Sequence, residues 1–174
     1  MNTTFEPGPL ADVERRADGD RWTLVFVRVL RHAPERVWAA LTEPAQLEAW
    51  APFTVDRDLG STGDATLTMI DGAVAEELPA SVRRAEPPML LEYTWGSDLL
   101  RWTLEPADAG TRLTLEHTLG DRDWVPKVAA GWHLCLDVAE RLLDGDPVGP
   151  IRGEDAKNFG WDRLRDAYAE RLGD

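Results

Sequence analysis

The residue of this 174-residue chain best suited to chemistry is a histidine on an otherwise apolar strand face. In the run TRLTLEHT, residues 111–118, alternation places His117 on the same face as Leu113 and Leu115, towards the interior. A buried imidazole needs a hydrogen-bond partner, and Tyr93, which faces the same way from another strand, is one candidate. His117 is therefore a core histidine, a polar anchor for a ligand, or a general acid or base, since imidazole titrates near neutral pH.

Other groups that could join such a site give weaker signals. Glu76 or Glu77 could add a carboxylate, but Pro79 argues for a bulge or an edge position and leaves open which face each glutamate takes. Cys135 falls in the apolar stripe of a predicted helix, which favours a buried core residue over a nucleophile. No serine lies in a G-x-S-x-G motif; the serines are Ser61, Ser81 and Ser97.

Neither a metal site nor a cofactor site is predicted. His133 and Asp137 lie one helical turn apart and could seat a cation, but we expect both beside the apolar stripe, on the solvent side. The segment GSTGD, residues 60–64, is glycine-rich but lacks the lysine and the following helix of a phosphate-binding loop. It therefore predicts a hairpin connection.

The composition is typical of a soluble globular protein. Hydrophobic residues make up 43% and charged residues 29% of the chain. No apolar run approaches the ~20 residues of a membrane helix, and no signal-peptide pattern is present, so we expect a cytoplasmic location. The net charge of −13 opposes binding to nucleic acid or to anionic membranes. A single cysteine cannot form an internal disulfide, and the eight tryptophans are an unusual number of rings for cores or ligand pockets.

The first part of the chain predicts an arm, a strand and two short helices. Residues 1–20 are polar and acidic, which indicates a flexible arm. The β-branched and aromatic run over residues 21–32 predicts a strand. Pro34 can open a helix, and Pro44 disfavours helical backbone at the residue before it. The first helix should therefore end near Thr42, and a second should begin at Pro44.

The remainder predicts a meander of strands followed by two helices. Between residues 53 and 118, alternating segments are separated by tight-turn signals, including Asp-Gly at 71–72 and Gly-Ser at 96–97. Apolar residues over 124–143 recur at helical spacing, and a helix of that length, ~28 Å, can cross the whole sheet. Residues 161–172 predict an amphipathic helix that covers either the domain's own surface or a dimer partner.

Together these elements predict an α+β protein. A curved antiparallel sheet of six to seven strands would wrap around the long C-terminal helix, with the two short helices after the first strand closing one end. The segments APERVWAALTEPAQLEAW, WTLEPADAGTRLTLEH and GWHLCLDVAERLLDG resemble the START-like, helix-grip superfamily. That superfamily includes polyketide cyclases, the birch-pollen-allergen proteins and the lipid-transfer START domains. The resemblance covers about residues 20–145 and is to the bacterial branch similar to the C-terminal domain of the activator of the heat-shock-protein-90 ATPase.

The resemblance implies a cavity between sheet and helix, and we predict that it binds a small hydrophobic or aromatic molecule with no assigned reaction. Apolar burial would provide the affinity, and His117 and Tyr93 would orient a polar end of the ligand. Trp38 is expected to be plain packing, and Trp50 and Phe53 are expected at the rim. The predicted ligand-binding residues are Trp50, Phe53, Met69, Tyr93, Trp95, Trp102, Leu104, Leu113, Leu115, His117, Trp132 and Leu136.

Two alternative functions stay open at this point. One is an enzyme of the cyclase or hydratase type, with His117 as its acid or base. The other, implied only by the family resemblance, is a co-chaperone or stress-response adaptor. The expected domain organisation is an acidic arm at 1–20, a helix-grip domain at 21–145 and a C-terminal extension at 146–174. The expected partner is the small ligand, with no nucleic acid and no membrane insertion, and a homodimer remains an option.

Overall fold

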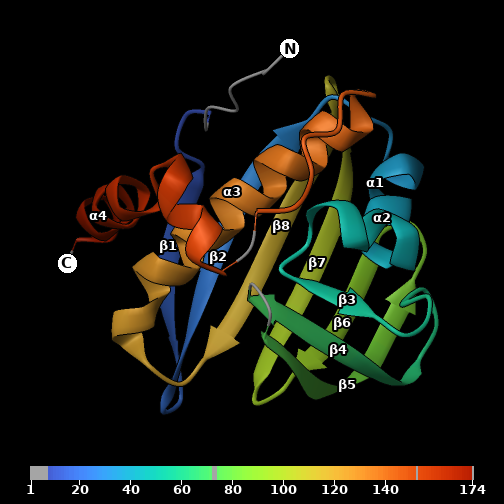
Figure 1. The fold of residues 1–174 in the computed structure, drawn as a ribbon, viewed down its shortest axis with the longest axis horizontal. Coiled ribbons are helices and arrows are strands. Elements are labelled where there is room, and N and C mark those ends of the chain that lie inside the picture. The colour runs from blue at the N-terminus through green and yellow to red at the C-terminus, as the bar shows by residue number, and fades with distance from the viewer. Residues whose placement is uncertain (1–7, 72–73, 152, 174) are drawn as a thin grey trace.

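The chain folds into one curved sheet that wraps around a long helix (Figure 1). The computed structural model describes residues 8–71, 74–151 and 153–173. Within them, eight strands pair antiparallel in the order β1-β2-β8-β7-β6-β5-β4-β3. The strands are β1 (Asp12–Asp18), β2 (Arg21–Leu30), β3 (Phe53–Val55), β4 (Gly63–Asp71), β5 (Val74–Glu86), β6 (Leu90–Trp95), β7 (Asp98–Ala107) and β8 (Gly110–Leu119). The predicted α+β helix-grip fold is confirmed, with eight strands in place of six to seven.

The edge strand β1 lies in the segment that was expected to be a flexible arm. It pairs with β2 along its whole length, from Asp12 opposite Val27 to Asp18 opposite Arg21. The turn between them contains Gly19, whose φ of 63° suits a tight two-residue connection. The strand was missed because its sequence, DVERRAD, lacks an alternating apolar face, as an edge strand can. Residues 1–7 lie outside the described part of the chain.

The two prolines divide the helical segment after β2 as predicted. Helix α1 spans Pro34–Thr42 and helix α2 spans Pro44–Trp50. Glu43 between them is extended, with φ −79° and ψ 126°, which is the conformation that a following proline favours. The Trp50 indole Nε1 donates a hydrogen bond to the Ala40 carbonyl oxygen at 2.8 Å, which joins the two helices.

Helix α3 (Val125–Leu143) lies across the concave face of the sheet (Figure 1). It follows a short 3-10 helix, η1 (Arg122–Trp124), and its apolar stripe is buried against the strands. The inward sets predicted from alternation are also buried: Leu113 and Leu115 on β8 pack in the same core as Leu104 on β7. Sheet, α3 and the α1–α2 pair therefore enclose one core.

The last helix, α4 (Trp161–Leu172), packs on the same chain, against α3 and β1 (Figure 1). It follows a second 3-10 helix, η2 (Gly153–Phe159). Its apolar face is covered there, because Leu164 and Tyr168 are both buried. Over the described residues, no helix has the length and apolar character needed to cross a membrane.

Candidate functional site

A cavity of about 670 Å³ lies between α3 and the sheet, a volume that suits a small organic ligand. The sheet contributes side chains from five strands: Met69 of β4, Glu76 and Leu78 of β5, Trp95 of β6, Asp98 of β7 and His117 of β8. The register explains why this end of the sheet is open. Pairing between β5 and β6 begins only at Val82, so the first half of β5 extends beyond β6.

The helix wall of the cavity is one repeating face of α3. Val128, Gly131, Trp132 and Cys135 all line the cavity, and their spacing of three and four residues puts them on one side of the helix. Gly131 leaves space there: a Cβ atom built on it meets nothing within 4 Å. The volume of the cavity therefore depends partly on one missing side chain.

The C-terminal extension completes the wall. Ile151, which is buried, and Ala156 in η2 line the cavity from the connection between α3 and α4. Trp124 lines it from η1 and is 52% exposed, so this ring borders solvent. The cavity wall therefore includes residues of the expected C-terminal extension, 146–174, together with residues of the expected helix-grip domain, 21–145.

Three polar side chains form a hydrogen-bonded chain along the cavity. The Trp132 indole Nε1 donates to His117 Nδ1 at 2.9 Å, and His117 Nε2 lies 2.7 Å from Asp98 Oδ2. An indole N–H can only donate, so His117 Nδ1 must accept with its lone pair. The proton of a neutral His117 is then on Nε2 and is donated to the Asp98 carboxylate. Both ring nitrogens of His117 therefore already have hydrogen-bond partners. This arrangement fits a role in positioning Asp98 better than it fits a role as a general acid or base.

Tyr93 is not the partner of His117. Its hydroxyl oxygen instead lies 3.4 Å from the Trp102 indole Nε1, and both side chains are about 1% exposed. Burial raises the pKa of the Tyr93 hydroxyl above its ordinary value. Tyr93 is therefore a neutral core residue, and the prediction that it faces a ligand beside His117 is not what the structure shows.

The predicted site residues divide between cavity wall and core. Four of them line the cavity: Met69, Trp95, His117 and Trp132. The other eight do not line it and are buried at 0–1% exposure: Trp50, Phe53, Tyr93, Trp102, Leu104, Leu113, Leu115 and Leu136. The expected rim positions of Trp50 and Phe53 are wrong, since their rings pack against Trp102 and Trp95 in the core. Trp38, expected to be plain packing, is half-buried against this core.

Two acidic residues line the cavity. Asp98 was not predicted as a site residue and the face of Glu76 was left undecided, although strand alternation could have placed both. Trp102 and Leu104 were assigned to the inner face of β7, and counting back in steps of two along that strand reaches Asp98. On β5, Glu76 lines the cavity and Glu77 does not, which resolves the open question of their faces. The strand register also places Glu76 opposite Met69.

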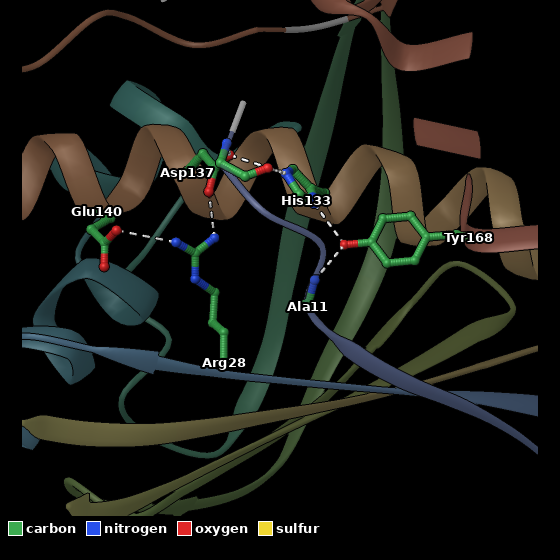
Figure 2. A network of polar contacts seen from close by, with 7 residues as sticks. Ala11, Arg28, His133, Asp137, Glu140 and Tyr168 are labelled. Atoms are coloured by element: carbon green, nitrogen blue, oxygen red, sulfur yellow. Dashed lines mark hydrogen bonds and ion pairs between the residues drawn. The ribbon is translucent and has the colours of Figure 1, made fainter. Parts of the chain in front are cut away.

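The outer side of α3 carries a second polar cluster, which is shown in Figure 2. Arg28 Nη1 pairs with Asp137 Oδ1 at 2.6 Å, and Asp137 Oδ2 lies 3.2 Å from His133 Nε2. His133 Nδ1 lies 2.6 Å from the Tyr168 hydroxyl, which also accepts a hydrogen bond from the Ala11 amide at 2.9 Å. The cluster therefore ties β2, α3, α4 and the segment before β1 together.

The expectation that His133 and Asp137 face solvent is wrong. Both are buried, at 1% and 8% exposure, because α4 and the segment around Gly8 cover this side of α3. Burial alone would raise the pKa of Asp137, but hydrogen bonds from His133 and the Gly8 amide and the charge of Arg28 hold that pKa below its ordinary value. Burial raises the pKa of Tyr168 to about 12. Each of these polar groups has a partner, so the cluster is a structural latch.

Metal chemistry finds no support in the part of the chain that the structure describes. There, no group of three or more His, Cys, Asp or Glu side chains could hold a metal ion. His133 and Asp137 lie together, but Asp137 is occupied by Arg28 and by the Gly8 amide. The cavity itself has a mostly apolar wall, with the polar chain of Trp132, His117 and Asp98 on one side.

Comparison with known proteins identifies the family. The family described as "Activator of Hsp90 ATPase homolog 1-like protein" matches residues 31–144, which is well over half of the chain. The chain belongs to this family. The matched residues begin just after β2 and end just after α3, so β1, β2 and α4 lie outside the match.

Solved structures of related fold agree with that assignment. The conserved protein EF2215 of unknown function from Enterococcus faecalis has a TM-score of 0.68 at 18% identity, over 91% of this chain and 89% of that one. CalU16 from Micromonospora echinospora has a TM-score of 0.66 at 19% identity, over 94% of this chain and 98% of CalU16. The AHSA1 protein from Silicibacter pomeroyi has a TM-score of 0.61 at 24% identity, over 71% of this chain and 99% of the Silicibacter chain.

These similarities show the fold and leave the ligand open. Identities below 25% carry no residue-level assignment, and the sequence matches no curated protein. Family and fold together support a ligand-binding domain, because a helix-grip sheet can enclose a cavity beside its long helix.

Proposed function

We propose that this protein binds a small, largely apolar molecule in the cavity between α3 and the sheet. The observation that carries the proposal is the cavity of about 670 Å³ itself, with aromatic and aliphatic walls and a few convergent polar groups. The cavity opens to solvent beside Trp124, and a concave, mostly apolar pocket of this size with a few polar groups is typical of small-molecule sites.

The walls suit an apolar body with one polar end. Leu78, Val128 and Ile151 offer aliphatic contact, and the rings of Trp95 and Trp132 lie 6.0 Å apart at 66°. Burial of apolar area would supply the binding free energy at roughly 25 cal/mol per Å². The polar chain through His117 would then orient the other end.

The enzyme hypothesis and the adaptor hypothesis have less support. Acid–base chemistry by His117 would require a substrate to displace Trp132 or Asp98 from its ring nitrogens. A co-chaperone role rests on the family name alone. Binding is therefore the function to test first.

Filling the cavity from α3 should abolish binding. Gly131→Phe would place a ring in the open space beside Trp132, so we expect decan-1-ol to raise the melting temperature of the wild-type protein and to leave that of the variant unchanged. Thermal unfolding monitored by circular dichroism measures both.

Gly131→Ala is the matched control. It adds one methyl group, so decan-1-ol should still bind, and it should stabilise α3 by about 1 kcal/mol because glycine is a poor helix residue. Stabilisation of the Gly131→Phe variant by decan-1-ol to the same extent as the wild type would contradict the proposed site.

A further inference from the structure

The charge of the cavity wall is one-sided. Glu76 and Asp98 contribute carboxylates, and no lysine or arginine is found among the described residues that line the cavity. Arg21, which does not line the cavity, reaches one of them: its Nη2 lies 3.6 Å from Asp98 Oδ1. That contact is long and its arginine is 40% exposed, so it neutralises the carboxylate only weakly.

The Asp98 carboxylate is fixed in an orientation in which it can accept a hydrogen bond from a ligand. His117 fixes its Oδ2 atom at 2.7 Å, and the His117 ring is itself fixed by the Trp132 indole. A carboxylate has about four acceptor positions, and this one uses one for a hydrogen bond to His117. Its Oδ1 atom, which lies 3.6 Å from Arg21 Nη2, has no hydrogen bond from the described residues, so it can accept one from a donor in the cavity.

The aromatic part of the wall also favours positive charge. Trp95 and Trp132 border the cavity close to His117, at ring-centroid distances of 5.8 Å and 6.1 Å. The faces of tryptophan rings attract ammonium groups. Trp124 already does so at the border of the cavity, where Lys127 Nζ lies 4.6 Å from its ring centroid.

An anionic ligand would meet the opposite situation. The carboxylate of a fatty acid would enter the cavity beside Asp98, whose side chain is 30% exposed, and beside the exposed Glu76, and both carboxylates would repel it. Within the described wall it would find no cation to pair with. The same wall therefore attracts one class of amphiphile and rejects another.

We propose that the ligand is an apolar molecule with one positively charged amine or quaternary ammonium group, which pairs with Asp98 and is supported by Glu76. This rests on the proposed function of the cavity and specifies the class of molecule that it takes. The apolar body lies along the aliphatic wall, and the cation lies between the carboxylates and the indole rings.

The test is a calorimetric titration at physiological salt of three ligands that share one chain: decylammonium, decan-1-ol and decanoate. Decylammonium and decanoate are kept below their micellar concentrations, and decan-1-ol is kept below its solubility limit. Decylammonium should bind about tenfold more tightly than decan-1-ol, as one charge-assisted hydrogen bond predicts, and decanoate should bind weakest. Asp98→Asn, which can still accept from His117, should remove most of the decylammonium advantage, measured against decan-1-ol binding to the same variant.

Two further variants separate local from general electrostatics. Glu76→Gln should reduce the decylammonium advantage by a smaller factor, and the Glu76 side chain forms no hydrogen bond within the described part of the chain. Glu105→Gln makes the same charge change at an exposed position of β7 outside the cavity, so the advantage should persist.

The outcomes separate this inference from the proposed function. Equal affinity for decylammonium and decan-1-ol, or tighter binding of decanoate, would overturn the cationic ligand and leave the apolar site standing. An equal loss of both ligands in Asp98→Asn, with Glu76→Gln without effect, would also overturn it. No binding of any of the three would instead refute the proposed function.

Discussion

Replacing Arg28 by methionine should lower the free energy of unfolding by about 3–5 kcal/mol, the usual cost of leaving a buried charge without its partner. Arg28 Nη1 lies 2.6 Å from Asp137 Oδ1 and Nη2 lies 3.2 Å from Glu140 Oε1, and the Asp137 side chain is only 9% exposed. Without the guanidinium, the buried Asp137 carboxylate would keep only the His133 ring and the Gly8 amide as partners. Urea denaturation followed by circular dichroism measures the difference.

The control for this effect is Arg141, in the last turn of α3. Arg141 pairs with Asp146 at 2.6 Å, but Asp146 is 65% exposed, so Arg141→Met should cost no more than about 1 kcal/mol. The double variant Arg28→Met with Asp137→Leu should recover part of the loss, because it removes the orphaned charge. A cost for Arg28→Met no larger than that for Arg141→Met would contradict the latch described in Figure 2.

Replacing Trp132 by alanine should lower the free energy of unfolding by a similar amount, about 3–5 kcal/mol. Its ring is 3% exposed and packs edge-on against Trp102 at 5.3 Å, and its indole N–H is the donor to His117 Nδ1. The variant would enlarge the cavity and leave the His117 lone pair without a partner. The change is measured as the shift in the urea midpoint at constant slope.

Trp124→Ala is the matched control for Trp132→Ala. Both rings line the cavity, but Trp124 is 52% exposed and lies in the 3-10 helix before α3. Its removal should cost about 1 kcal/mol or less, because it gives up little buried area. Similar losses for the two variants would contradict the different roles assigned to them, with Trp132 as a core support and Trp124 as a border residue.

Local signals in the sequence predicted most of the fold. The prolines at 34 and 44 fixed the ends of α1 and α2, because they act on the backbone of their immediate neighbours. The repeating apolar positions of 125–143 identified α3. The predictions that were wrong concern residues whose structure depends on distant segments. Strand β1 has no apolar pattern and forms by pairing with β2. His133 is buried because α4 covers it.

The candidate site was predictable only in part, for a physical reason. Alternation assigns a side chain to the inner face, but it does not tell whether that face meets another side chain or a void. Trp102 and Trp95 both face inward, yet one is packed in the core and the other lines the cavity. The difference depends on where β5 extends past β6 and on Gly131, which are matters of register and volume that a single strand pattern does not contain.

The most direct measurement is the set of tryptophan indole N–H signals in the ¹⁵N NMR spectrum during titration with decan-1-ol. The ligand should shift the signals of Trp95 and Trp132, whose rings line the cavity, and should leave those of Trp22 and Trp38, which do not line it, in place. In Gly131→Phe the same addition should shift none of the four. Shifts confined to Trp22 or Trp38, or no shift at all at saturating decan-1-ol, would contradict ligand binding between α3 and the sheet.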